Sequence, residues 1–359
     1  MTRMKRRDLI RIAGALGVSA VLVGAGCGDA QPDEPTPAPT SAPPAPTATQ
    51  AAVAAAPTQA SPATIAPTQM PATAAAAATA PATVGPTISV GQAYLAVARG
   101  GDPATITQRA IAAVGGMERF VRSGANVIIK PNICVAYHTF EYGATTNPDV
   151  VAELVRLCLA AGAKRVRVMD TPFGGRAEEA YAVSGIAEAV KAAGGEMEIM
   201  SPVKYKDTPI PDGVDIKNWA VYQEIIEADL VINVPIAKHH SLARLTLGGK
   251  NFLGVARNPN QLHRNLGQRI ADLVSLVRPE LTVVDAIRTM MRNGPSGGNL
   301  DDVQKQDTII ASPDIVAADA YAATLFGLKG EDIGYVKAAA EMGLGRLDLA
   351  NLKIEEISA

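Results

Sequence analysis

Short apolar runs alternate with longer helical patterns from about residue 89 to the C-terminus. The run at residues 125–130 (ANVIIK) is rich in β-branched residues and has the length of a buried strand. Asn147 followed by Pro148 is typical of a helix start, and Gly162 is expected to close that helix. By the same criteria we expect strands at residues 165–170, 196–200, 229–235, 281–285, 307–312 and 352–357, and helices at residues 176–193, 219–227, 266–277, 314–326 and 331–342.

Apolar strands separated by helices of this length predict an α/β fold. Strands that are apolar on both faces favour a mainly parallel sheet with helices on both sides. The interval 241–264 has no clear period, and we expect it to form a lid or a small subdomain.

The first 88 residues have a different composition from the rest of the chain. Thirteen of the 25 prolines lie between Pro32 and Pro86, and no aromatic residue precedes Tyr94. Such a segment has too little apolar surface to form a packed core. We therefore expect residues 28–88 to be a disordered, extended Pro/Thr/Ala-rich tether and residues 89–359 to be one α/β domain, large enough to bury a core.

Residues 1–27 have the features of an export signal. Basic residues 5–7 precede an apolar run, residues 12–26, that is too short to span a membrane. The paired arginines resemble the twin-arginine export motif. The residues before Cys27 resemble a bacterial lipobox, although Gly24 stands where leucine is usual. We expect an exported protein, at the cell surface or in the periplasm, anchored through a lipid on Cys27; a plain cleaved signal with an incidental cysteine is the alternative.

The charge balance excludes some partners. From residue 89 onward the chain has 28 basic and 31 acidic residues, a net charge of −3. A nearly neutral domain lacks the basic surface of a nucleic-acid-binding protein. It also has no electrostatic attraction to a membrane, so we expect membrane contact through the lipid anchor only.

The three cysteines exclude the common cysteine-based cofactor sites. No CxxC pair occurs, so an iron–sulfur cluster or a zinc ribbon has no cysteine ligands here. Cys158 falls on the apolar face of the helix that begins at Pro148, where we expect a buried thiol. A disulfide between Cys134 and Cys158 is the less favoured alternative.

Polar residues collect where the predicted strands end. Ligands of open parallel α/β sheets bind beyond the carboxyl ends of the strands, so these residues are expected to meet at one edge of the sheet. The residues that follow strands are Lys130, Asn132, Asp170, Lys238, His239 and Asp285, and further candidates in irregular stretches are Lys250, Asn251, Gly294, Gly297 and Gly298.

These residue types favour the binding of an anion. Lys130 and Lys238 are the first candidates for catalytic residues, because two cations at neighbouring strand ends repel each other unless an anion or carboxylates lie between them. His239 is the acid–base candidate, since its side chain titrates near neutrality. Asn132, Lys250 and Asn251 would bind the ligand, as would backbone N–H groups of the glycine-rich loop. The alternatives are solvated lysines and a loop that only needs positive φ angles.

A divalent metal is a further possibility. Asp170 and Asp285, together with His239, could form a metal site if the fold brings them together. The four histidines show no HxxH or HxH spacing, so this metal hypothesis is weaker than the anion hypothesis.

A further set of motifs occurs in order along the chain: Lys130-Pro131-Asn132, Thr145-Thr146-Asn147-Pro148, Gly162-Ala163, Asp170, Val234-Pro235, Lys238-His239, Thr246, Lys250-Asn251, Gly254, His263, Asp285, Gly294-Pro295, Gly297 and Ala317-Ala318-Asp319-Ala320. Together they resemble one bacterial and archaeal family, catalogued as domain of unknown function 362. The resemblance covers most of residues 95–330 and implies an α/β domain whose Lys, Asn and Asp residues form a site, without an established activity. Many relatives carry ferredoxin-type modules, whose cysteines this chain lacks.

Three classes of function fit the sequence. The first is an enzyme acting on a small anionic substrate. The second is a tethered solute-binding or sensing module without chemistry, and the third is a redox protein that carries a cofactor. We favour the first over the second because solute-binding proteins usually have two lobes, whereas this chain has one continuous βα series.

Overall fold

The fold is built on one large sheet, seen in a computed structural model that describes residues 93–358. Eight strands run in the order β12-β1-β11-β10-β7-β2-β3-β4, and β8 and β9 extend the sheet beside β10. Their bounds are β1 Leu95–Arg99, β2 Asn126–Pro131, β3 Arg165–Val168, β4 Glu196–Met197, β7 Leu230–Val234, β8 Ile236–His240, β9 Arg244–Thr246, β10 Leu281–Met290, β11 Val303–Ser312 and β12 Ile354–Ser358. A separate antiparallel pair contains β5 (Tyr205–Pro209) and β6 (Asn218–Tyr222).

The sheet is mostly parallel, as the sequence predicted. Strands β10, β7, β2, β3 and β4 are parallel neighbours, and β8 is parallel to β10. The antiparallel exceptions are β11, which pairs with β1 and β10, and the short β9, which pairs with β8. The parallel strands therefore bring the carboxyl ends of β2, β3 and β7 to one edge.

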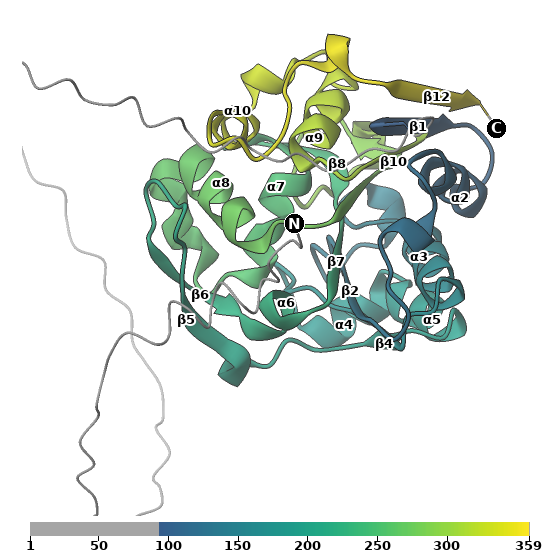
Figure 1. The fold of residues 1–359 in the computed structure, drawn as a ribbon, viewed down its shortest axis with the longest axis horizontal. Helices are drawn as coiled ribbons and strands as arrows, with labels where there is room; N and C mark the ends of the chain where they lie inside the picture. Colours follow the sequence, from purple (N-terminus) through teal and green to yellow (C-terminus); the bar gives the residue numbers. More distant parts are fainter. Residues whose placement is uncertain (1–92, 359) are drawn as a thin grey trace, which may run out of the picture. The chain divides into compact units, whose positions relative to one another are not determined.

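Helices cover both faces of the sheet, and each face has its own apolar core. Alternate residues of a strand point to opposite faces: Leu95 and Val97 belong to one core, and Ala96 and Ala98 to the other. In Figure 1, α2, α3 and α5 lie on one side of the sheet and α8, α9 and α10 on the other. The helices are α2 Pro103–Ala113, α3 Pro148–Ala160, α4 Ala177–Val183, α5 Ile186–Ala192, α6 Gln223–Glu227, α7 Gly248–Asn251, α8 Leu266–Val277, α9 Ile315–Thr324 and α10 Gly334–Glu341.

Most predicted elements are present, and three expectations need correction. The helix expected at residues 176–193 is two helices, because Gly185 adopts a left-handed conformation with φ 76° between α4 and α5. The helix expected at residues 219–227 is divided between strand β6, which pairs with β5 and contains residues 219–222, and the short α6, which contains residues 223–227. The interval 241–264 does not form a separate subdomain, because its apolar side chains are buried in the core shared with α8 and α9.

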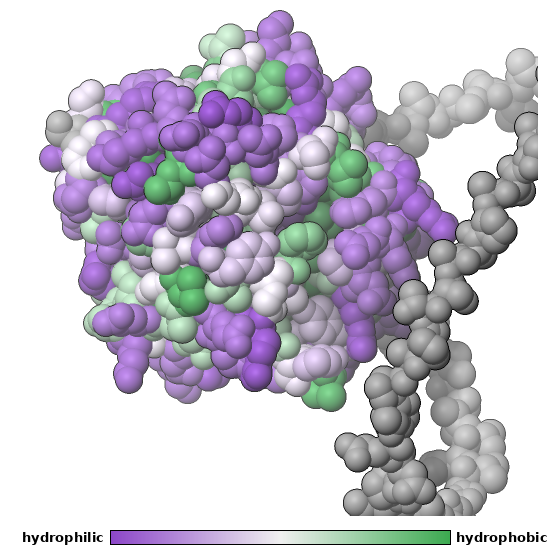
Figure 2. Space-filling view, turned by 180° about the vertical axis from the view of Figure 1, so that it is seen from behind, coloured by the Kyte–Doolittle hydropathy of each residue, from purple (hydrophilic) through white to green (hydrophobic). Residues whose placement is uncertain are grey.

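The part of the chain described by the structure contains no helix of the length and apolarity that crossing a membrane requires. The face shown in Figure 2 is largely hydrophilic, with apolar residues in separate spots. The predicted export signal, Cys27 and the predicted tether at residues 28–88 lie outside the described residues.

Candidate functional site

A buried ion pair joins the ends of β2 and β3. Lys130 is the penultimate residue of β2 and Asp170 follows β3, so the parallel pairing of these strands brings the two side chains together. Lys130 Nζ lies 2.6 Å from Asp170 Oδ1, and the side chains are 0% and 2% exposed. The Asp170 carboxylate also accepts hydrogen bonds from the backbone N–H of Ile133 and of Thr171. Burial lowers the pKa of Lys130 and raises that of Asp170, and the attraction within the pair opposes both shifts.

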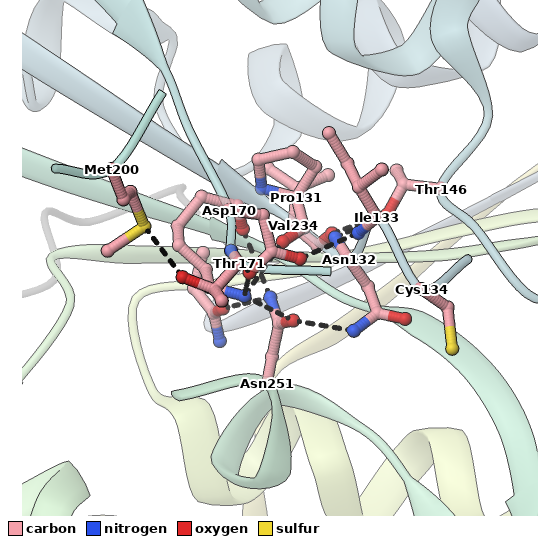
Figure 3. Close-up of polar contacts among 12 residues, drawn as sticks. Pro131, Asn132, Ile133, Cys134, Thr146, Asp170, Thr171, Met200, Val234 and Asn251 are labelled. Atoms are coloured by element: carbon pink, nitrogen blue, oxygen red, sulfur yellow. Dashed lines mark hydrogen bonds and ion pairs between the residues drawn. The ribbon is translucent and has the colours of Figure 1, made fainter. Parts of the chain in front are cut away.

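The amide of Asn251 connects this pair to its surroundings (Figure 3). Its Oδ1 accepts hydrogen bonds from Lys130 Nζ and Asn132 Nδ2, at 2.9 and 3.1 Å. Its Nδ2 donates to the Lys130 carbonyl oxygen and to Asn233 Oδ1, at 3.0 and 2.9 Å. A buried amide with all these bonds has one well-defined orientation, so Asn251 fixes α7 against β2 and β7.

A second buried lysine lies on the other side of Asn132. Lys238 is in the middle of β8 and is 1% exposed. Its Nζ donates to Asn132 Oδ1 at 2.8 Å and to the Ala144 carbonyl oxygen at 2.6 Å. The backbone of Asn132 is held by Thr146, whose hydroxyl accepts from the Asn132 N–H and donates to the Val234 carbonyl. Asn132 itself is partly exposed, so this end of the network reaches the surface.

Lys250 is the third lysine, and it differs from the other two. It is partly exposed, and its ammonium group makes no hydrogen bond or ion pair with any residue among 93–358. Burial is the largest influence on its pKa, followed by repulsion from Lys238; the nearby Lys130 adds further repulsion, and together they lower the pKa to about 8. The helix that carries Lys250 is held by Asp319, whose carboxylate accepts from the N–H groups of Gly248 and Gly249.

The structure separates the two adjacent histidines. His240 is on the same face of β8 as Lys238, because residues two apart on a strand point the same way. Its Nδ1 accepts from the N–H groups of Leu242 and Ala243, so its other nitrogen carries the hydrogen. Burial, then Lys250 and Lys238, lower the pKa of His240 to about 3, which keeps the ring neutral at physiological pH.

His239, the histidine that the sequence favoured as an acid–base group, points to the opposite face. Its Nδ1 accepts from the N–H of Gly294 at 3.1 Å. The predicted acid–base role of His239 is therefore not supported by proximity to Lys238 or Lys130. The ring instead contacts the loop at residues 293–298.

The loop at residues 293–298 has the features of a turn that needs positive φ angles, the simpler of the two interpretations of its glycines. Gly297 and Gly298 have φ angles of 69° and 138°, a region that favours glycine. A Cβ on Gly294 would lie 2.0 Å from the His239 carbonyl oxygen, so close backbone packing requires glycine there too. The Pro295 carbonyl accepts a hydrogen bond from the Cys134 thiol, which places the loop at the border of the site.

Asp285 is not part of the lysine cluster. Its carboxylate accepts from the N–H groups of Asn147 and Ile287, and burial raises its pKa to about 6. Asp170 is bound to Lys130 and to backbone N–H groups. Within residues 93–358 no three His, Cys, Asp or Glu side chains form a group that could hold a metal ion, so the metal hypothesis for Asp170 and Asp285 gains no support.

Several members of the site were not among the residues that we predicted as ligands. Asn233, Thr246 and Asp319 are buried polar residues, and Asn233 interrupts the apolar strand β7, which is a pattern visible in the sequence. Gly254 packs directly on the buried pair: a Cβ there would lie 2.2 Å from Asp170 Oδ1 and 2.8 Å from Lys130 Nζ.

The cysteines do not form a cluster site or a disulfide in the described part of the chain. Cys134 and Cys158 are both buried and free. Burial raises the pKa of Cys158 to about 12, which makes it an inert core thiol. Two separated thiols do not fit the cysteine ligand set of a ferredoxin-type cluster, so no electron-transfer step through such a cluster follows from this chain.

The solved structures found to be similar are distant. A protein of Thermotoga maritima shares 14% identity at a TM-score of 0.38, over 63% of this chain and 60% of that protein. The lactate racemase apoprotein of Thermoanaerobacterium thermosaccharolyticum shares 12% identity, also at a TM-score of 0.38, over 68% of this chain and 56% of the racemase. The chain thus spans about 60% of the length of these structures, and at this level of similarity neither gives a role to any residue here.

Comparison with characterised sequences gives a family. The thylakoid-associated protein sll1697 of Synechocystis is 26% identical over 251 residues, which are 64% of this chain and 72% of that protein. The family described as "Domain of unknown function (DUF362)" matches residues 127–324, which is more than half of the chain and includes β2, β7, β8 and α7. The chain therefore belongs to the DUF362 family.

Proposed function

We propose that Lys238 and Lys250, placed beside the buried Lys130, bind a small anion, a carboxylate or a phosphate, and that the protein acts on this anion chemically. The observation that carries this proposal is the ammonium group of Lys250, which has no partner among residues 93–358 and is partly exposed near two buried ammonium groups. Asp170 neutralises Lys130, whereas no carboxylate of the described residues is among the groups that shift the pKa of Lys250. A bound anion would relieve the remaining repulsion between Lys238 and Lys250.

The hydrogen bonds of the three lysines support a division of roles among them. Lys130 has three ammonium protons and three acceptors, namely Asp170, Asn251 and the Pro131 carbonyl, so none is left for a ligand. Lys238 uses two of its protons, on Asn132 and Ala144. The third proton of Lys238 and those of Lys250 are therefore the donors that we assign to the anion.

Thr246 gives independent support for a ligand beside Lys238. It lies directly opposite Lys238 in the antiparallel pairing of β8 and β9, so both side chains are on the same face. Thr246 is 3% exposed, and within the described residues its hydroxyl has no hydrogen-bond partner. A buried hydroxyl without a partner is costly, and a ligand oxygen at this position would satisfy it.

Replacement of Lys250 by methionine is expected to weaken anion binding by about tenfold or more, because it removes a charge-assisted hydrogen bond. Titration calorimetry with phosphate, pyruvate and malonate measures this change. Lys337→Met is the matched control, since Lys337 is an exposed residue of α10 that pairs with Glu341, and it should leave the affinity unchanged. No binding of any of these anions by the unsubstituted protein, or equal binding by the Lys250→Met variant, would refute the anion site.

Catalysis is distinguished from binding alone by turnover. The purified protein is incubated with each anion that it binds, and the solution is analysed by mass spectrometry for a converted product. A converted product supports an enzyme. An anion that stays bound and unchanged favours the solute-binding or sensing module instead.

We also propose that the protein is exported and anchored to a membrane through a lipid on Cys27. The support is the basic and apolar pattern of residues 1–27 and the description of the Synechocystis relative as thylakoid-associated. Cys27→Ala is expected to move the protein from the membrane fraction to the soluble fraction and to abolish incorporation of a labelled fatty acid. Unchanged labelling and fractionation of this variant would show that Cys27 is not the anchor.

A further inference from the structure

The surroundings of Lys250 hold its backbone firmly. The Asp319 carboxylate accepts hydrogen bonds from the N–H groups of Gly248 and Gly249, the two residues before Lys250, at 2.7 and 2.8 Å. Asn251, the residue after it, is fixed by the hydrogen bonds of its amide to β2 and β7. These hydrogen bonds fix the backbone at Lys250. The Lys250 ammonium group itself has no hydrogen-bond or ion-pair partner within the described residues. A functional side chain held on a rigid backbone is suited to covalent chemistry.

The charges around Lys250 favour the neutral amine, which is the nucleophilic form of lysine. Lysines become nucleophilic when desolvated or placed beside another cation. Buried Lys238 and Lys130 lower the pKa of Lys250 by repelling its charge, and the nearby Cys134 acts in the opposite direction. The two other titratable neighbours, His240 and His263, both have lowered pKa values, each in part because of Lys250.

We propose that Lys250 is a nucleophilic amine that forms an imine with the carbonyl carbon of a small 2-oxo acid. This inference rests on the proposed anion site, and it names the substrate class of that site. The ammonium form of Lys250, the third ammonium proton of Lys238 and the Thr246 hydroxyl bind the acid. Lys250 then loses one proton to solvent, and the resulting neutral amine faces the carbonyl carbon. Lys130 is hydrogen-bonded on all three of its ammonium protons and fully buried, so it does not compete as the nucleophile.

The step is balanced without a further reactant. The neutral amine adds to the carbonyl carbon, and a carbon–nitrogen bond forms as the carbonyl π bond opens. Both amine hydrogens move to the oxygen, which leaves as water when the carbon–oxygen bond breaks. The resulting imine takes up one proton from solvent and becomes a cationic electron sink, which suits chemistry at the carbon next to the former carbonyl.

Borohydride trapping tests this proposal on the full-length protein. The protein is incubated with pyruvate, glyoxylate, 2-oxobutyrate or 2-oxoglutarate, reduced with sodium borohydride and analysed by intact-mass and peptide mass spectrometry. We expect one reduced adduct per chain with at least one of these acids, located at Lys250. Lys250→Arg should lose the adduct but still bind the acid in titration calorimetry, because arginine remains cationic. The matched control Lys337→Arg should form the adduct as the unsubstituted protein does.

The outcomes separate the imine from the anion site. Binding of the oxo acids that depends on Lys250, without any trapped adduct, would overturn the imine and leave the anion site standing. Adducts spread over surface lysines would also overturn it. Absence of any binding would overturn both proposals. Labelling with acetic anhydride over a pH series gives a second measure: Lys250 should reach half of its maximal rate near pH 8, well below Lys337, and equal profiles would contradict a nucleophilic Lys250.

Discussion

Replacement of Lys130 by methionine is expected to lower the free energy of unfolding by about 3–5 kcal/mol, the usual cost of breaking a buried ion pair on one side. The substitution leaves the Asp170 carboxylate buried without its cation, and it also removes a hydrogen bond to Asn251. Urea unfolding monitored by circular dichroism measures this change. The loss of stability distinguishes Lys130 from Lys250, whose replacement removes no hydrogen bond or ion pair within the described residues.

Two further variants make the Lys130 experiment decisive. Lys337→Met breaks an exposed pair on α10 and should cost at most about 1 kcal/mol. The double variant Lys130→Met, Asp170→Asn also removes the buried negative charge of Asp170, so it should recover part of the lost free energy of unfolding. A Lys130→Met variant as stable as the unsubstituted protein would show that the pair is not buried as described.

Replacement of Gly254 by alanine is expected to cost about 1–3 kcal/mol, the range typical of overpacking. The added methyl group would lie 2.2 Å from Asp170 Oδ1, closer than any real contact allows. Asp170 cannot move away easily, because its carboxylate is bound by Lys130 and by backbone N–H groups. Thermal and urea unfolding measure the effect.

Gly334→Ala is the matched control for Gly254→Ala. Gly334 is the first residue of α10, and a Cβ there meets only Gly267 Cα at 3.9 Å, which is an ordinary contact. Alanine is also the better helix former, so this variant should be neutral or slightly more stable. Equal effects of the two substitutions would contradict the close packing of Gly254 on the buried pair.

The meeting of Lys130, Asn132, Asp170 and Lys238 could be predicted from the sequence. Each follows or ends an apolar run, and parallel strands carry their carboxyl ends to one edge of the sheet. The same argument failed for Asp285. Its strand continues to Met290, so Asp285 lies inside β10 rather than at its end, and its carboxylate accepts hydrogen bonds from the backbone N–H groups of Asn147 and Ile287.

The ranking of the three lysines could not be predicted. Which ammonium group remains unpaired depends on how Asp170, Asn132 and Asn251 distribute their hydrogen bonds, and these side chains come from segments far apart in the sequence. The interval that carries Lys250 and Asn251 showed no helical or strand period. Its order comes from tertiary bonds, such as those of Asp319 to the N-terminus of α7.

Local patterns also explain the errors in secondary structure. The segment Asn218–Tyr222 (NWAVY) contains aromatic and β-branched residues, which favours a strand, and it pairs with β5. The apolar residues on both sides of Gly185 have helical spacing, so only its left-handed conformation reveals the break between α4 and α5.

The central claim is that Lys250 has an unpaired ammonium group in a site built for an anion, and its titration tests this most directly. Nuclear magnetic resonance of the protein with labelled lysine side chains, assigned with the Lys250→Arg variant, follows this group over pH. The claim predicts a midpoint near pH 8, because burial and the neighbouring lysines lower the pKa from 10.5, and an upward shift on addition of phosphate or pyruvate, because a bound anion favours the charged form. Anion affinity should accordingly fall as the pH rises through 8. A midpoint near 10.5 that does not respond to either anion would contradict the claim.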